Sequence, residues 1–264
     1  VHSSRSIIGS ELDYKQFSSG GFYLTPNTNE LDVSLYGFNE TDFSSFNLLS
    51  AFRLSYLLIN PNQYTYENIE SQQIINRNFI YYSSSLGFNK IMNDFEMNTW
   101  IMNTMRAPRV EELYSDGPHL GAYSYEIGEP NLDVEKIYGI ESSIAYNAYP
   151  LKTSITTFYN YSPYYHQMSK MGECEGEFVD GENHPCAGAD FIEWGSGPIG
   201  WLYKYQTKGV KSIIKGIELN LGYSFKNYKL VYDFSLVRGD DLTSGLPLSF
   251  INPDKQIMIF GYEK

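Results

Sequence analysis

Apolar and polar residues alternate strictly along several long stretches of this chain. In residues 215–225, five apolar residues fall on one face: Ile217, Leu219, Leu221, Tyr223 and Phe225. The positions between them are small or polar: Gly216, Glu218, Asn220, Gly222 and Ser224. A period of two predicts a β-strand with one apolar and one polar face. Residues 46–58, 138–147 and 230–236 alternate in the same way. Runs of about ten residues are longer than most globular strands and near the length that a tilted strand needs to cross a bilayer.

The spacing of these stretches predicts about ten strands. Their approximate ranges are 5–14, 30–41, 46–59, 77–89, 94–106, 136–149, 151–165, 208–225, 228–239 and 255–264. The connections alternate between long and short. The short ones lie at 42–45, 90–93, 150 and 226–227, and the long ones at 15–29, 60–76, 107–135, 166–207 and 240–254. An outer-membrane barrel sorts its connections in this way, because its short turns are periplasmic and its long loops external.

We therefore predict an all-β, antiparallel up-and-down transmembrane β-barrel whose short turns share one rim. In this architecture the apolar set faces lipid on the convex side, and its members are Ile217, Leu219, Leu221, Tyr223, Leu230, Tyr232, Phe234 and Leu236. The polar set faces the concave interior: Glu218, Asn220, Asp233 and Ser235. A charge on the lipid side would cost roughly 2–4 kcal/mol at mid-membrane.

The composition narrows the class of protein further. The chain has 264 residues, of which 42% are hydrophobic and 19% charged, so it can form one large domain and is not of the disordered class. Its net charge of −12 makes nucleic acid a poor partner, since phosphate contacts need clustered Lys and Arg. No run of eighteen apolar residues occurs, which excludes a transmembrane helix, and the N-terminal sequence has no signal-peptide core.

The segment 106–135 carries several short motifs in a fixed order. They are RAPRVEELY at 106–114, GPHLG at 117–121, EIGEPNL at 126–132, and Glu135. This order resembles a segment in the barrel domain of TonB-dependent outer-membrane receptors, where the same pieces join two strands. Residues 20–40, 207–225 and 236–255 are similar to other parts of that domain, although Asn252-Pro253 stands where two prolines are usual. The resemblance covers most of residues 15–264.

The resemblance implies a receptor in the outer membrane of a Gram-negative bacterium, in contact with outer-membrane lipid. Its function would be uptake of a scarce nutrient (a metal, a metal chelate or a similar small-molecule ligand), energised by the TonB complex through a plug domain. No plug domain is recognisable here, and about ten strands are under half of the family's twenty-two. We therefore expect residues 1–264 to be part of the barrel domain, without the plug and the C-terminal strands.

Catalytic motifs are not found in the sequence, which has no Gly-x-Ser-x-Gly, no His-Glu-x-x-His and no phosphate-binding glycine loop. We expect neither enzymatic activity nor a cofactor. Two alternatives remain. A self-contained ten-stranded barrel of the omptin protease type would need an Asp-x-His pair, but the residues two before His119, His166 and His184 are Gly117, Tyr164 and Glu182. A soluble β-rich glycan-binding module would have a polar outward face.

The resemblance also suggests which residues face a ligand. In the segment 106–135 these are Arg109, Glu111, His119, Tyr123 and Tyr125. Trp194 and Trp201, in the long glycine-rich connection, either join them or belong to an interfacial aromatic girdle. The alternative for the segment is structural, with its prolines and glycines folding it back over the barrel.

Histidines and cysteines in the long connections are candidates for metal binding. His119, His166 and His184 could contribute to a transient zinc site, although no pair has the i, i+2 or i+4 spacing of ligands, and they could equally be ordinary loop residues. Cys174 and Cys186 are predicted to form a disulfide, which suits an oxidising compartment. Thiolate metal ligation together with His184 is the alternative.

Overall fold

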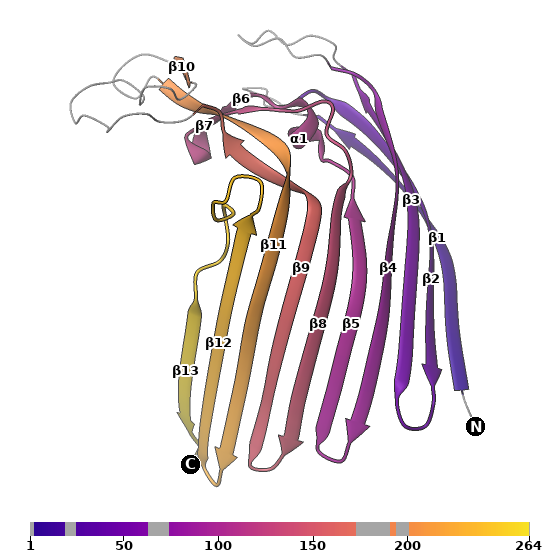
Figure 1. Ribbon diagram of the computed structural model, residues 1–264, viewed down its shortest axis with the longest axis vertical. Helices are drawn as coiled ribbons and strands as arrows, with labels where there is room; N and C mark the ends of the chain where they lie inside the picture. The colour runs from indigo at the N-terminus through magenta and orange to yellow at the C-terminus, as the bar shows by residue number, and fades with distance from the viewer. Residues whose placement is uncertain (1–2, 19–24, 63–73, 173–190, 194–200, 264) are drawn as a thin grey trace, which may run out of the picture.

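Ten long strands lie side by side in a single sheet (Figure 1). The computed structural model describes residues 3–18, 25–62, 74–172, 191–193 and 201–263. In sheet order the ten strands are β1 (Ser3–Phe17), β2 (Thr28–Asp42), β3 (Asn47–Pro61), β4 (Arg77–Met92), β5 (Phe95–Arg106), β8 (Glu135–Ala148), β9 (Leu151–Lys170), β11 (Trp201–Phe225), β12 (Tyr228–Asp241) and β13 (Lys255–Tyr262). Each pairs antiparallel with the next, so the predicted antiparallel architecture is confirmed.

All short connections lie on one rim of the sheet. Figure 1 shows the turns β2–β3, β4–β5, β8–β9 and β11–β12 along its lower edge, and the long connections along its upper edge. We call these edges the short-turn rim and the loop rim. Three of the short turns have a residue in the left-handed region, namely Ser44, Asn93 and Lys226. Tight hairpin turns need such a residue to match the twist of their strands. The predicted sorting of the connections is confirmed.

Apolar side chains share one face across the whole sheet. Residues paired across antiparallel strands point to the same side. The register pairs Ile217 with Leu236 and Leu219 with Phe234, and between these rungs it pairs Glu218 with Ser235. One rung of the same apolar face continues through Leu86, Ile101, Ile140 and Tyr159. The predicted segregation of the two residue sets onto opposite faces is therefore present.

The apolar face is uncovered. Ile8 is 81% exposed, Ile80 72% and Met258 70%. In the part of the chain that the structure describes, all strands belong to one sheet, so no second sheet packs on this face. A soluble β-sandwich would bury these side chains between two sheets. No described helix has the length and apolar character required to span a membrane.

The polar face is the inner side of the curved sheet. On this face Arg53 of β3 donates to Glu11 of β1 at 2.8 Å, reaching across β2. Tyr81 of β4 likewise donates to Asp32 of β2 at 3.2 Å. Side chains that meet over an intervening strand converge, as they do on the inside of a curve. The short helix α1 (Val110–Tyr114) packs on the same face.

The long connections contain structure that the sequence pattern did not predict. Besides α1 they hold β6 (Asp116–His119), a 3-10 turn η1 (Leu120–Ala122), β7 (Ser124–Ile127) and β10 (Phe191–Glu193). Strands β9 and β11 are also longer than predicted at the loop rim. His166 consequently lies inside β9, and its expected position at the edge of a loop was wrong.

Candidate functional site

Helix α1 begins with a capping interaction supplied by the Arg-Val-Glu-Glu run. Arg109 is the N-cap residue, and its backbone N–H donates to the Glu112 carboxylate at 2.8 Å. A Glu at the third helical position commonly satisfies the N-cap amide in this way. Because the helix has only five residues, it depends on tertiary contacts for its stability.

One side of α1 is buried against the strand wall. Val110, Leu113 and Tyr114 pack with Ile59 of β3 and Phe79 of β4 in one hydrophobic cluster. The Tyr114 hydroxyl donates to the backbone carbonyl of residue 75 at 2.6 Å, and burial raises the pKa of this hydroxyl. The helix is thereby fixed to the polar face at the loop rim.

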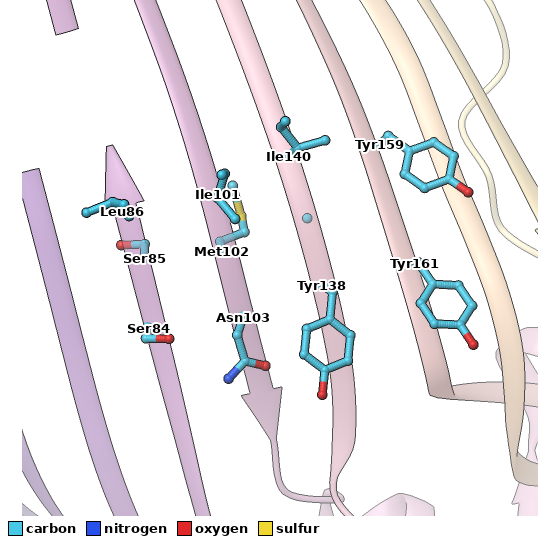
Figure 2. A pocket seen from close by; sticks show the side chains of 11 residues that line it. Ser84, Ser85, Leu86, Ile101, Met102, Asn103, Tyr138, Ile140, Tyr159 and Tyr161 are labelled. Atoms are coloured by element: carbon cyan, nitrogen blue, oxygen red, sulfur yellow. The ribbon is translucent and has the colours of Figure 1, made fainter. Parts of the chain in front are cut away.

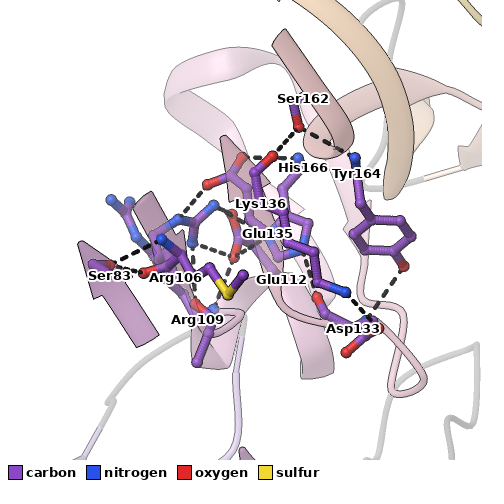
Figure 3. Close-up of polar contacts among 12 residues, drawn as sticks. Ser83, Arg106, Arg109, Glu112, Asp133, Glu135, Lys136, Ser162, Tyr164 and His166 are labelled. Atoms are coloured by element: carbon purple, nitrogen blue, oxygen red, sulfur yellow. Dashed lines mark hydrogen bonds and ion pairs between the residues drawn. The ribbon is translucent and has the colours of Figure 1, made fainter. Parts of the chain in front are cut away.

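Arg106, the last residue of β5, ties α1 to the strands (Figure 3). Its guanidinium donates to both carboxylate oxygens of Glu112, at 2.8 and 3.0 Å, and its Nε donates to Glu135 at 2.8 Å. Glu135 begins β8 and is the register partner of Arg106. A bidentate arginine–carboxylate pair fixes geometry as well as charge.

His166 completes this network from β9. Its side chain is fully buried. Nδ1 lies 3.1 Å from Nη2 of Arg106, Nε2 lies 2.8 Å from the backbone oxygen of Asp133, and its backbone N–H donates to Glu135 at 2.9 Å. A carbonyl oxygen only accepts, so Nε2 carries the proton and Nδ1 is free to accept from the guanidinium. We call Arg106, Glu112, Glu135 and His166 the rim network.

Electrostatics within the rim network favour the ionised form of Glu112. Burial alone would raise the pKa of this carboxyl group. The adjacent His166 imidazole, the Arg106 guanidinium and the backbone N–H of Arg109 outweigh burial and lower the pKa from 4.5 to about 2. Glu112 is therefore a charged anchor at physiological pH.

A cleft of about 510 Å³ separates the start of the 107–134 segment from β1, β2, β3 and β4. Its lining mixes apolar and charged side chains: Lys15, Gln16, Phe17, Glu30, Asp32, Leu57, Tyr81, Arg106, Ala107, Pro108, Arg109, Val110 and Glu111. Lys15 pairs with Asp13 at 3.0 Å, outside this lining. Among the described residues, Glu30, Asp32, Arg109 and Glu111 take part in no ion pair. The cleft thus offers three carboxylates and one guanidinium beside apolar side chains.

The second half of the segment folds as a small hairpin. Strands β6 and β7 pair with each other, and β7 pairs in parallel with residues 203–206 of β11. Tyr125 is fully buried and its hydroxyl donates to Asp116 at 2.8 Å. His119 Nδ1 lies 2.6 Å from a carboxylate oxygen of Glu126. Tyr123, with a φ of 52°, is 67% exposed.

The structure therefore places only some of the residues expected to face a ligand in the cleft. Arg109 and Glu111 line the cleft, whereas His119 and Tyr123 are exposed on the hairpin, outside the cleft lining. Tyr125 is an interior residue of the hairpin, a position that its sequence pattern did not reveal. Trp201 is the first residue of β11, but its side chain, like Trp194, lies outside the described residues.

The candidate metal residues do not converge. His119 and His166 have separate partners, Glu126 and the rim network. Within the described ranges, no group of three His, Cys, Asp or Glu side chains is arranged to hold a metal ion. His184, Cys174 and Cys186 lie outside those ranges, so the predicted disulfide and the thiolate alternative both remain predictions.

Aromatic rings border the apolar face at both ends. A shallow groove on this face is lined by aliphatic Leu86, Ile101 and Ile140, with Tyr138 and Tyr161 nearer the loop rim. Figure 2 shows the hydroxyls of these two tyrosines directed toward the end of β5, that is, toward the loop rim. On the same face near the short-turn rim lie Phe88, Phe95, Tyr146, Tyr223, Phe225, Tyr228 and Tyr262. Two aromatic borders around an aliphatic band are typical of barrels that sit in a bilayer.

No protein-family model matches the chain, and no curated protein matches it in sequence. Several solved structures match it in fold. The copper transporter OprC superposes with a TM-score of 0.70 at 14% identity, over 90% of this chain and 34% of OprC. The Serratia marcescens hemophore receptor HasR, solved with its hemophore HasA and heme, gives 0.63 at 15% identity, over 89% of this chain and 39% of HasR.

The FrpB iron transporter from Neisseria meningitidis gives a TM-score of 0.52 at 11% identity, over 83% of this chain and 27% of FrpB. The chain thus spans between about a quarter and two fifths of the length of these proteins. At such low identity the likeness concerns the fold. Together with the single antiparallel sheet, its sorted connections and its two distinct faces, the likeness shows that this chain has a TonB-dependent receptor barrel-like fold.

Proposed function

We propose that this chain forms part of the wall of an outer-membrane receptor of a Gram-negative bacterium. The observation that carries the proposal is the exposed apolar band between two aromatic borders. In β8 the band runs from Tyr138 to Tyr146. Eight residues at about 3.4 Å each give roughly 27 Å along the strand, or about 20 Å across the membrane for a tilt of 35–45°. This height is close to the roughly 25 Å apolar band of outer-membrane barrels.

In this proposal the receptor takes up a scarce nutrient with energy supplied by the TonB complex, acting through a plug domain outside this chain. The loop rim faces the exterior and captures the ligand. The similar structures are a copper transporter, a receptor solved with heme and an iron transporter, which supports a metal or metal chelate as the ligand class. Arg109 and Glu111 in the cleft are the proposed contacts.

The alternatives have weaker support. The similar structures are transporters and a receptor rather than enzymes, which disfavours a protease of the omptin type. The apolar face disfavours a soluble glycan-binding module, whose outward surface would be polar. We propose that the protein carries out no covalent chemistry and that loop side chains determine its specificity.

The test is uptake by cells that produce the full-length receptor. Accumulation of iron, copper or heme is measured with TonB present and with TonB deleted. We expect accumulation of one of the three to require both the receptor and TonB. The double variant Arg109→Gln/Glu111→Gln should then lower the affinity at least about tenfold, because each lost charged contact contributes roughly 1–3 kcal/mol. Lys208→Gln, an exposed charge outside the cleft lining, is the matched control. Accumulation that is independent of TonB would contradict the proposal.

A further inference from the structure

His166 is placed where the protonation of a single ring nitrogen decides which side chain it contacts. Its Nε2 donates to the backbone oxygen of Asp133 at 2.8 Å. Its Nδ1 faces a donor, Nη2 of Arg106, at 3.1 Å and an acceptor, Oε2 of Glu112, at 3.4 Å. The shorter contact is the one that a neutral ring makes, because only an unprotonated Nδ1 accepts from a guanidinium.

Protonation reverses the role of this nitrogen. A protonated Nδ1 can no longer accept from Arg106, and both groups then present N–H bonds to each other. The nearest acceptor for the new N–H is Oε2 of Glu112, which already accepts from Nη1 of Arg106 and from the backbone N–H of Arg109, each at 2.8 Å. Three donors then compete for one carboxylate oxygen.

We infer that His166 is a proton-sensitive positioning residue for helix α1. In the neutral state, Glu112 caps α1 and is held by Arg106. In the protonated state, Glu112 turns toward β9, and the cap on Arg109 weakens. Arg109 and Glu111 border the cleft, so loosening of α1 changes the shape of the proposed ligand site. This consequence rests on the proposed function, whereas the movement of α1 does not.

The other titratable and charged groups around His166 offer no alternative acceptor to a protonated Nδ1. Glu135 accepts from the backbone N–H of His166 and from Arg106, so its two oxygens are already occupied. The Tyr164 ring lies edge-on to the imidazole, with 5.7 Å between ring centroids. The Asp133 carboxylate is paired with Lys136 at 3.8 Å. Tyr165 interacts with the network electrostatically and contacts neither ring nitrogen in a described hydrogen bond.

The experiment is hydrogen exchange by mass spectrometry on the full-length receptor in lipid nanodiscs, without ligand. Exchange is measured at about pH 5.5 and about pH 7.5, on either side of the range in which histidines commonly titrate, and is corrected for intrinsic rates. In the wild-type protein, the peptide covering residues 110–115 should exchange at least about tenfold faster at the lower pH, since one charge-assisted hydrogen bond is given up. The variant His166→Gln, neutral at both pH values, should show less than a twofold difference.

His119→Gln is the control, because it removes a histidine from the segment that contains α1 but outside the rim network. It should keep the wild-type difference. The inference is overturned if His166→Gln keeps this difference or if His119→Gln abolishes it. Nitrogen NMR on the wild-type protein provides a test that needs no variant. Nδ1 of His166 should be unprotonated at the higher pH and protonated at the lower. A ring whose Nδ1 has the same protonation state at both pH values also overturns the inference. These measurements need no ligand, so they test the movement of α1 even if the uptake assay fails.

Discussion

Replacing Glu112 with glutamine removes the charged anchor of the rim network. The side chain is 17% exposed and binds Arg106 through both oxygens, while one oxygen also caps α1. Glutamine keeps the shape but loses the charge and one acceptor. The guanidinium is then left with Glu135 as its remaining carboxylate partner in the described part of the network.

The free energy that ionised Glu112 contributes follows from its lowered pKa. A fall from 4.5 to about 2 is about 2.5 units, and one unit corresponds to about 1.4 kcal/mol. Allowing for residual solvent screening, ionisation of Glu112 stabilises the folded 107–134 segment by about 2–3 kcal/mol. Because the folded-state pKa is depressed, this contribution is fully present above about pH 4.5 and is lost as the pH falls toward 2.

The assay is hydrogen exchange in the peptide covering residues 110–115. At neutral pH, Glu112→Gln should accelerate exchange by about 30–150-fold, the equivalent of 2–3 kcal/mol. By about pH 3 the difference in free energy between variant and wild type should shrink to less than half, because the open state of the wild type is then protonated. Glu111→Gln, an exposed neighbour without an ion pair in the described structure, should change exchange less than threefold. Equal effects of the two variants, or an acceleration under threefold for Glu112→Gln, would refute this reasoning.

Two further predictions concern packing and the cysteines. Gly216→Ala should destabilise the barrel by about 1–3 kcal/mol in a urea titration in lipid, since its Cβ would lie 2.5 Å from the Phe158 ring. Gly222→Ala on the same strand, with no atom nearer than 3.7 Å to the added Cβ, should be tolerated, and an equal loss for both would contradict the prediction. Cys174 and Cys186 should resist thiol labelling until reductant is added, whereas full labelling without reductant would reject the disulfide and zinc protection of the thiols would favour metal ligation.

The ten-stranded sheet was predictable because the alternation of apolar and polar residues marks each strand in its own sequence. A strand with one face in an apolar medium must alternate along its whole length, and in β11 residues 216–225 do so without a break. The lengths of the connections then predicted which strand ends lie on the short-turn rim and which lie on the loop rim. Closer to the loop rim, the consecutive β9 residues His166 and Gln167 are both buried, so alternation no longer marks the strand. His166 was therefore predicted at the edge of a loop although it lies within β9.

The fold of the 107–134 segment could not be derived from its own sequence. Strands β6 and β7 have four residues each, too few to show a period, and β7 is held by pairing with residues 203–206, about 80 positions away. The resemblance of its segment placed Tyr125 on a ligand surface. Tyrosine suits exposed and buried positions equally, so its residue type did not reveal that it is buried. Arg109 and Glu111 do line a cleft, because α1 buries its other side.

The orientation of β11 in a bilayer decides whether the apolar face of the sheet contacts lipid. Single cysteines are placed at positions 217–222 of the full-length receptor, with the native cysteines replaced, and are spin-labelled in nanodiscs. Labels at 217, 219 and 221 should be accessible to oxygen dissolved in the lipid, and labels at 218, 220 and 222 to a water-soluble quencher, with a period of two. Equal access of the water-soluble quencher to all six positions, or the opposite phase, would contradict a wall that faces lipid with its apolar side.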